Sequence, residues 1–323
     1  MAGSATFVEG TEPFRRELLA HCYRMLGSLH DAEDLVQETY LRASRSYAKF
    51  EGRSSLRTWL YRIATNVCLT ALAHRSRRVL PSGLGGPDPD PDAAPTPAPS
   101  DVAWLQPIPD SMVGPVPGDP AVVVSDRQDL RLALIASLQY LPGRQRAVLI
   151  LRDVLDFPGA EVAVMLGTTT VAVKSTLQRA RARLAELALV ADDVVEPTDP
   201  ETRAVLDRYI EAFQNADAKA LQHLLCGDAT LEATPFLNWF AGNETCVPYL
   251  RRRVMGSPGD WRMLATRANG QPAAVCYTRD PSGAYQSYGV VVLTVTARGI
   301  SQIVSFGDHS LPRAFGFPAV LKA

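Results

Sequence analysis

The sequence predicts a multidomain protein in which two all-α domains, separated by a proline-rich linker, precede a C-terminal α+β domain. Apolar residues recur at helical spacing over residues 7–78 and again over residues 126–190. Between them, residues 79–125 contain 12 of the 24 prolines and no lysine or arginine. From residue 198, two helical patterns are followed by alternating strand patterns, an order typical of α+β domains.

Composition excludes several classes of protein. An apolar fraction of 46% over 323 residues is that of a folded chain rather than a disordered one. No apolar run approaches the ~18 residues of a membrane span, and the N-terminal residues show no secretory signal pattern. The five cysteines are widely spaced without a CxxC pair, which argues against a disulfide scaffold or a zinc finger. We therefore expect a cytoplasmic protein that does not act at a membrane.

The net charge of −1 is an average over unlike segments. Residues 1–78 hold 12 basic and 8 acidic residues, and residues 126–190 hold 9 and 6. The linker has six aspartates, and residues 191–323 hold 12 basic and 14 acidic residues. Near-neutrality therefore does not exclude nucleic acid as a partner, because both helical segments are basic.

The first helical segment begins with a helix over Phe14–Leu26 that Gly27 ends. Ser28 and Asp31 stand in capping-box spacing and open a second helix that runs to about Tyr47. One face of this second helix carries three acids, Asp31, Asp34 and Glu38. They form either a docking face for a basic partner or a solvated face whose first acids favour the helix dipole.

A third helix follows a serine-containing turn at residues 50–55, with Ser54 or Ser55 as its cap. Its apolar stripe includes Trp59, for which a core position is the simpler interpretation. The helix ends in an arginine cluster at residues 75–78, which suits either the helix dipole or DNA phosphates. Aromatic residues near such a turn also fit a surface that holds unstacked bases.

The second helical segment predicts a helix-turn-helix motif. The expected helices cover residues 126–141, a stretch from Pro142, residues 160–166, and residues 170 to about 189, with a turn at Gly167. The apolar positions that lock the motif are Val162, Ala163, Leu166, Val171, Val173 and Leu177. The outward residues of the last helix carry groups suited to bases and phosphates: Ala172, Lys174, Ser175, Thr176, Gln178, Arg179 and Arg181. A helical hairpin with a solvated basic face is the alternative.

These two segments resemble bacterial sigma factors of the extracytoplasmic-function (ECF) group. The region 2 resemblance rests on residues 21–27, 31–38, 50–55 and 58–66 (HCYRMLG, DAEDLVQE, FEGRSS and TWLYRIATN). The region 4 resemblance rests on residues 141–148, 161–163, 173–175 and 178–181 (LPGRQRAV, EVA, VKS and QRAR). It implies an alternative sigma factor that directs RNA polymerase to promoters. One departure from many relatives is Thr176, where they carry arginine, so the promoter sequence is not carried over.

The resemblance also implies residue roles. Contacts to the RNA polymerase core, at the clamp of its large catalytic subunit, fall on Asp31, Asp34, Leu35, Gln37 and Glu38. Contacts to the −10 element of promoter DNA fall on Phe50, Ser54, Ser55, Arg62, Asn66, Arg75, Arg77 and Arg78. The outward residues of the helix from Thr170 would contact the −35 element. Linker residues 79–125 would run extended toward the polymerase active site, their acidity mimicking nucleic acid, with residues 102–110 docking on a neighbouring domain.

Residues 198–323 predict helices at 201–215 and 218–225, then strands at 230–232, 261–268, 273–278, 286–296 and 300–306. This order resembles the SnoaL-like cone, found appended to some ECF sigma factors. A pocket would be lined by Trp239, Trp261, Tyr288 and His309, with Phe240, Tyr277 and Asp308 as further candidates. We expect no cofactor, metal or catalytic residue, and a regulatory role. The C-terminal domain could bind a small ligand or an anti-sigma partner. Two alternative functions also remain open: an enzyme whose catalytic site lies in the cone, and a repressor that uses only the helix-turn-helix.

Overall fold

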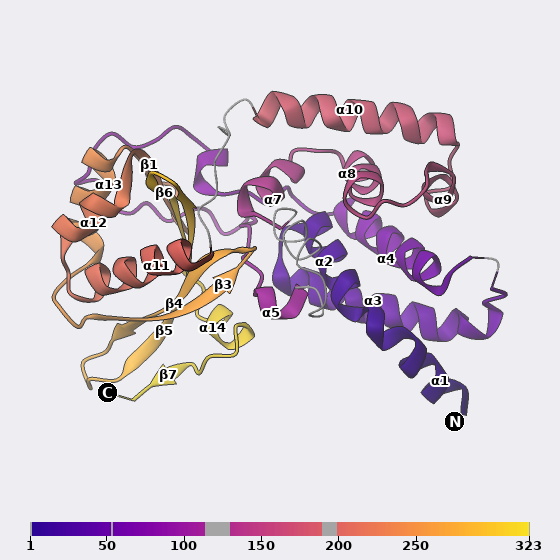
Figure 1. The fold of residues 1–323 in the computed structure, drawn as a ribbon, viewed down its shortest axis with the longest axis horizontal. Helices are drawn as coiled ribbons and strands as arrows, with labels where there is room; N and C mark the ends of the chain where they lie inside the picture. Colours follow the sequence, from indigo (N-terminus) through magenta and orange to yellow (C-terminus); the bar gives the residue numbers. More distant parts are fainter. Residues whose placement is uncertain (1, 53, 114–129, 189–198, 323) are drawn as a thin grey trace. The chain divides into compact units, whose positions relative to one another are not determined.

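The computed structural model describes residues 2–52, 54–113, 130–188 and 199–322. The chain divides into two compact units, Met1–Arg78 with Ser111–Ala191 and Val79–Asp110 with Asp192–Ala323. The first unit is helical and the second contains the sheet (Figure 1). The predicted combination of all-α domains with a C-terminal α+β domain is confirmed. Residues 79–110 of the predicted linker belong to the same unit as the sheet domain.

Local signals in the sequence fix the ends of the region 2 helices. Gly27 ends α2 in the left-handed conformation, with φ of 69°. The Ser28 hydroxyl caps α3 by accepting a hydrogen bond from the Asp31 amide, and Ser55 caps α4 through the Thr58 amide. Trp59 is 8% exposed, as a core position requires. The helices are α1 (Ala2–Thr11), α2 (Arg15–Leu26), α3 (Leu29–Ser46) and α4 (Leu56–Leu72); the short α5 (Asp110–Val113) lies within the predicted linker.

The helix-turn-helix motif is present in region 4. Its turn contains Gly167 at φ of 59°, a conformation that glycine adopts without strain. The prediction that Val171 helps to lock the motif is wrong, because its side chain is 77% exposed. Val171 lies two residues before Val173, about 200° around the helix, so it faces away from the side that buries Val173 and Leu177. The helices are α7 (Leu132–Leu138), α8 (Gly143–Leu149, continued by a π-helical turn to Val154), α9 (Gly159–Met165) and α10 (Thr170–Ala188).

Within the first unit, region 4 packs on region 2 around one buried arginine. Arg146 of α8 is 4% exposed and donates to Oε1 of Gln139 at 2.7 Å, to the carbonyl oxygens of Gln139 and Leu141, and to that of Met25 in α2. Burial lowers the pKa of the Arg146 guanidinium to about 10, so it stays charged at neutral pH. One cation therefore joins α2, α7 and α8.

The second unit is built on a mixed sheet with strand order β2-β1-β6-β5-β4-β3, and β7 pairs with β5. β1 and β6 are parallel and the other neighbouring pairs are antiparallel. Helix α11 packs against β3 and β4 (Figure 1). The elements are α11 (Asp199–Gln214), α12 (Ala218–Leu224), β1 (Leu225–Thr234), β2 (Trp239–Ala241), α13 (Asn243–Tyr249), β3 (Trp261–Ala268), β4 (Gln271–Arg279), β5 (Tyr285–Thr296), β6 (Gly299–Phe306), α14 (Leu311–Ala314) and β7 (Val320–Leu321).

Four described elements of this unit are absent from the sequence prediction: β2, α13, α14 and β7. Helix α13 contains Pro248, which argues against a helix when only local sequence is considered. β2 and β7 have three and two residues, too few for an alternating pattern. Their pairing with β1 and β5 supplies the hydrogen bonds that local sequence does not predict.

Candidate functional site

The acidic face of α3 contains carboxylates in different settings. Asp31 is held inside region 2, where it pairs with Arg75 at 2.6 Å and Arg78 at 2.5 Å. Asp34 is exposed, and Glu38 pairs with Arg42 one turn later on the same helix. Of the other two residues predicted to contact polymerase, Gln37 is exposed and Leu35 half-buried. The Asp31 carboxylate is thus used in ion pairs within region 2, whereas the Asp34 carboxylate lies exposed at the surface.

An aromatic cluster forms where the serine-containing turn meets α4. The ring of Phe50 lies 5.0 Å from that of Trp59 and stacks on Tyr47 at 6.4 Å. Ser54 is exposed, while the Ser55 hydroxyl is used as the helix cap. Phe50 is half-buried and Ser54 is exposed, so both residues remain partly accessible beside the turn.

Region 4 contacts part of the predicted −10 surface. The Asn66 amide donates to the carbonyl oxygens of Arg62 and, at 3.4 Å, of Met165 in α9. The guanidinium of Arg77 lies 4.0 Å from the ring centre of Tyr140. Arg75 and Arg78 are engaged with Asp31, as described above. Arg62 itself is exposed. In this arrangement the predicted −10 residues are divided between region 4 contacts, internal ion pairs and solvent.

Two residues that sequence reasoning missed also join regions 2 and 4. The Thr58 hydroxyl donates to a carboxylate oxygen of Glu161 in α9 at 2.8 Å. Glu161 belongs to a motif that carried the region 4 resemblance, but its spacing to Thr58 gives no signal. Nearby, Arg57 lies over the rings of Tyr61 and Phe157 at 5.0 and 4.7 Å.

The predicted −35 residues lie along one side of α10. Lys174, Ser175 and Gln178 are exposed, while Ala172 and Thr176 are half-buried. Arg179 is exposed and donates to the Thr176 hydroxyl at 3.2 Å. Arg181 is exposed and forms two hydrogen bonds, of 2.7 and 2.8 Å, with Asp153. The helix therefore offers lysine, glutamine and arginine side chains at its surface, with the buried residues on the opposite side.

The second unit encloses a largely apolar cavity of about 230 Å³. Of the four residues predicted for a pocket, Trp261 and Tyr288 line it, with their rings 5.1 Å apart. Trp239 and His309 do not line it: the Trp239 indole donates to the Gly85 carbonyl, and the His309 ring contacts the Ser287 carbonyl. The lining consists of Pro95, Tyr209, Phe213, Leu231, Ala233, Phe236, Tyr249, Leu250, Arg253, Val254, Trp261, Met263, Cys276, Tyr288, Val291, Ile303 and Ser305.

The remaining candidates of this pocket have structural roles. Phe240 stacks on Tyr249 at 4.0 Å, and the Tyr277 hydroxyl donates to the Pro318 carbonyl. The Asp308 carboxylate accepts hydrogen bonds from the amide and the hydroxyl of Ser310, at 2.9 and 2.6 Å. Asp308 therefore caps a turn.

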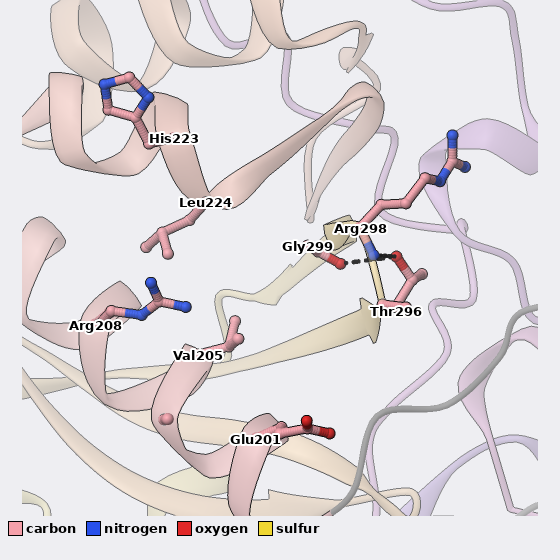
Figure 2. Close-up of a pocket in the computed structure, with 10 residues that line it drawn as sticks. Glu201, Val205, Arg208, His223, Leu224, Thr296, Arg298 and Gly299 are labelled. Carbon is pink, nitrogen blue, oxygen red and sulfur yellow. Dashed lines mark hydrogen bonds between the residues drawn. The ribbon is translucent and has the colours of Figure 1, made fainter.

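A wider, more polar hollow of about 530 Å³ lies between α11, α12 and the β5–β6 turn. Figure 2 shows that its charged side chains, Glu201, Arg208 and Arg298, do not converge on one point. The Thr296 hydroxyl is used within the turn, where it donates to Gly299 and accepts from the Arg298 amide. This hollow therefore lacks the converging groups of a binding site, and the apolar cavity is the better candidate.

A helix-turn-helix motif with an exposed basic helix and a helical region with an acidic helix face are the features expected of a transcription initiation factor of the sigma class. Sigma-70 region 2 matches residues 11–78 and Sigma-70 region 4 matches residues 131–184. The chain is 49% identical over 314 residues to the ECF RNA polymerase sigma factor SigG of Mycobacterium tuberculosis, covering 97% of this chain and 84% of SigG. The chain therefore belongs to the ECF RNA polymerase sigma factors, which direct RNA polymerase to promoter DNA.

Further relatives agree with this assignment. SigW of Bacillus subtilis is 27% identical over 178 residues, covering 55% of this chain and 86% of SigW. The crystal structure of the extracytoplasmic function sigma factor SigJ of M. tuberculosis superimposes with a TM-score of 0.59 at 23% identity, covering 97% of this chain and 99% of SigJ. The SigJ likeness extends the shared fold to the C-terminal domain, as the SnoaL-like prediction requires. Among the described residues, no helix is both long and apolar enough for a membrane span.

Proposed function

We propose that this sigma factor contacts the clamp of the large catalytic subunit of RNA polymerase through α3, with Asp34 and Glu38 as the main charged contacts. The observation that carries this is the difference among the acids of α3. Asp31 is engaged by two arginines, whereas Asp34 is exposed and Glu38 has only a local, half-exposed partner. Exposed ion pairs of that kind contribute little, so Glu38 is available to a partner.

The docking proposal is tested by measuring the affinity of the full chain for core polymerase. Replacing Asp34 and Glu38 by lysine reverses the charge of the face, so we expect binding to weaken at least tenfold while the helix content stays the same. A matched control is Asp228→Lys, which makes the same kind of change at an exposed acid of the sheet domain. Unchanged affinity in the double variant would show that polymerase docks elsewhere.

We propose that α10 contacts the −35 element and that the turn and exposed arginines of region 2 contact the −10 element. Because Asn66 and Arg77 contact region 4 in this structure, region 4 has to move from region 2 before all the proposed −10 contacts form. For α10, Gln178→Ala is expected to relax promoter selectivity, whereas Lys174→Ala weakens binding more evenly across sequences. The control is Arg183→Ala on the same helix, measured by promoter binding of the holoenzyme.

We propose that the C-terminal domain regulates this activity and has no catalytic role, and that the protein acts in the cytoplasm, where its polymerase and promoter partners are. Supporting the regulatory role, residues 79–110, which lead from region 2 toward region 4, pack with the sheet domain. In-vitro transcription with core polymerase, comparing the full chain with a truncation near Val195, tests it. Equal promoter-specific activity of the two proteins would remove the regulatory role.

A further inference from the structure

A segment of the predicted linker, residues 85–98, is fastened along the sheet domain; we call it the strap. Three backbone hydrogen bonds join it to the chain after β1. The Asp88 amide donates to the Trp239 carbonyl at 2.7 Å, and the Ala98 amide to that of Pro235 at 2.9 Å. The Leu237 amide donates in return to the Thr96 carbonyl at 2.8 Å. The strap therefore follows residues 235–239 in an ordered course.

Side chains fasten the strap at further points. The Asn238 amide bridges two strap residues, donating to the Asp88 carboxylate at 2.7 Å and accepting from the Thr96 amide at 2.6 Å. Arg252 pairs with the Asp92 carboxylate at 2.5 Å, and Arg253 donates to the Asp92 carbonyl. Together these contacts hold the strap on both sides of Pro95.

Pro95 is the part of the strap that lines the apolar cavity. Two residues that contact or neighbour the strap line the cavity as well. Phe236 belongs to the segment 235–239 along which the strap runs, and Arg253 donates to the Asp92 carbonyl. Proline has no amide hydrogen to satisfy, so its ring covers apolar side chains without leaving a donor unpaired. The strap thus forms one wall of the cavity, and lifting it removes that wall.

The cavity lining defines the chemistry of a ligand. Its charged member, Arg253, donates to the Asp92 carbonyl of the strap, and every other lining residue is uncharged, so most of the lining favours a neutral molecule. Hydroxyls of Tyr209, Tyr288 and Ser305 offer hydrogen bonds, and burial raises the pKa of both tyrosines, which places it still further above neutral pH. About 230 Å³ lies below the usual 300–1,000 Å³ of ligand pockets, which suits a molecule of one or two rings.

We propose that this cavity binds a small, neutral, largely apolar ring compound, and that the strap is its lid. The ligand enters when the strap lifts, and the strap then closes over it. The strap is part of the segment that joins region 2 to region 4. Ligand binding in the cavity therefore changes the freedom of this linker, and through it the positions that the two promoter-binding regions can take. This last step rests on the proposed regulatory role of the C-terminal domain, whereas the binding step does not.

Titrating the full chain with 1-naphthol, a neutral two-ring probe with one hydroxyl, tests the site. Calorimetry is expected to show saturable one-to-one binding with a micromolar dissociation constant. Ala233→Trp fills the cavity and is expected to weaken binding at least tenfold, with Ala233→Leu as a milder variant that still reduces the space. Absence of saturable binding to the unaltered chain, or tighter binding of 1-naphthoate, overturns the ligand class. If both Ala233 variants bind 1-naphthol as tightly as the unaltered chain does, this cavity is not the binding site.

Stopped-flow kinetics with the same probe test the lid. Asp92→Ala and Asn238→Ala each remove strap fasteners outside the lining, so association and dissociation of 1-naphthol are both expected to quicken several-fold. The control is Asp101→Ala, an equal loss of charge at an exposed linker residue beyond the strap. Unchanged rates in both strap variants overturn the lid. These experiments contain no polymerase, so their outcome is independent of the transcription comparison that tests the proposed function.

Discussion

Region 4 and the strap are both held by a neighbouring part of their unit, but different chemical groups hold them. Region 4 is held on region 2 by side chains: the buried Arg146, the Thr58–Glu161 pair and the stacked Arg57. The strap is held by backbone hydrogen bonds to residues 235–239, with Asn238 and Arg252 as reinforcement.

This difference determines how each contact responds to mutation and pH. Side-chain contacts disappear when one residue changes or titrates, and a partner that offers better contacts can replace them. Backbone hydrogen bonds depend on chain geometry and survive most substitutions. The region 2–region 4 contact is therefore the more sensitive of the two, and the following predictions test that ranking.

The largest effect is expected for Arg146→Ala. Removing the buried guanidinium leaves several carbonyl oxygens without a donor, at a cost of about 3 kcal/mol or more in the free energy of unfolding of the helical unit. Hydrogen exchange of α4 and α8 amides measures the loss, and amides of β4 and β5 serve as an internal reference. The exposed neighbour Arg144 provides the control, Arg144→Ala. Comparable effects of the two substitutions would contradict the proposal that Arg146 holds α2, α7 and α8 together.

A second effect follows from His21, which is fully buried in α2 and contacts the Thr65 hydroxyl at 2.9 Å. Burial, with nearby Arg24 and Arg57, lowers its pKa from 6.5 to about 3. Between these values the unfolded chain binds a proton that the folded chain does not. Stability is therefore fully present above pH 6.5 and falls as the pH decreases toward 3, by about 2 kcal/mol between pH 6.5 and pH 5.

Unfolding by urea at several pH values measures the His21 effect. His21→Gln keeps a polar group near Thr65 and removes the titration, so the pH slope of the helical unit should flatten below pH 6.5. A slope that persists in this variant would assign the titration to another group. Backbone contacts of the strap should change little over the same pH range.

A smaller effect is expected at residue 110, the last residue of the linker that belongs to the sheet unit. The Asp110 carboxylate accepts from the Gly270 amide at 2.8 Å and pairs with Arg267 at 3.1 Å. Asp110→Asn weakens both interactions and should cost about 1.5 kcal/mol locally. Faster hydrogen exchange at the Gly270 and Asn269 amides measures this loosening. Asp101→Asn is the matched control, and equal exchange in the two variants would exclude an anchoring role.

The smallest effect is expected for the Thr58–Glu161 pair. A double-mutant cycle with Thr58→Val and Glu161→Gln should give a coupling of about 1 kcal/mol, since one hydrogen bond to a partly exposed carboxylate is lost. Unfolding of the full chain measures this value. A coupling near zero would indicate that Glu161 does not help to hold region 4, and that the contact rests on Arg146 and the aromatic residues.

Much of the fold follows from local sequence. Capping residues such as Ser28 and Ser55, and Gly27 and Gly167 at positive φ, mark helix ends because each satisfies or terminates a helix by itself. The exposure of Lys174 and Gln178 likewise follows from helical periodicity. Val171 is the exception, because at about 100° per residue it lies on the side of α10 opposite the buried Val173 and Ala180.

The candidate cavity was only half predictable. Trp261 and Tyr288 lie on strands in which the alternation of apolar and polar residues indicates the face of the sheet on which each side chain lies, and both line the cavity. Trp239 and His309 lie in short or irregular segments, where no periodicity sets the direction of the side chain. Tyr209 and Pro95 were missed because one looks like an ordinary core residue and the other like part of a flexible linker.

The sequence by itself determined the family, most helix boundaries and the helix-then-sheet order, because motifs, caps and periodicity act over a few residues. The helix predicted over residues 126–141 is an exception, since among the described residues it covers only Leu132–Leu138. Only the tertiary structure decided that the acidic, proline-rich segment lies ordered on the sheet domain. Asp88, Asp92 and Asp110 look like solvated charges until Asn238, Arg252 and Arg267, more than a hundred residues away, are placed beside them. Long-range pairing of this kind depends on how the strands of the sheet domain come together, which no local pattern encodes.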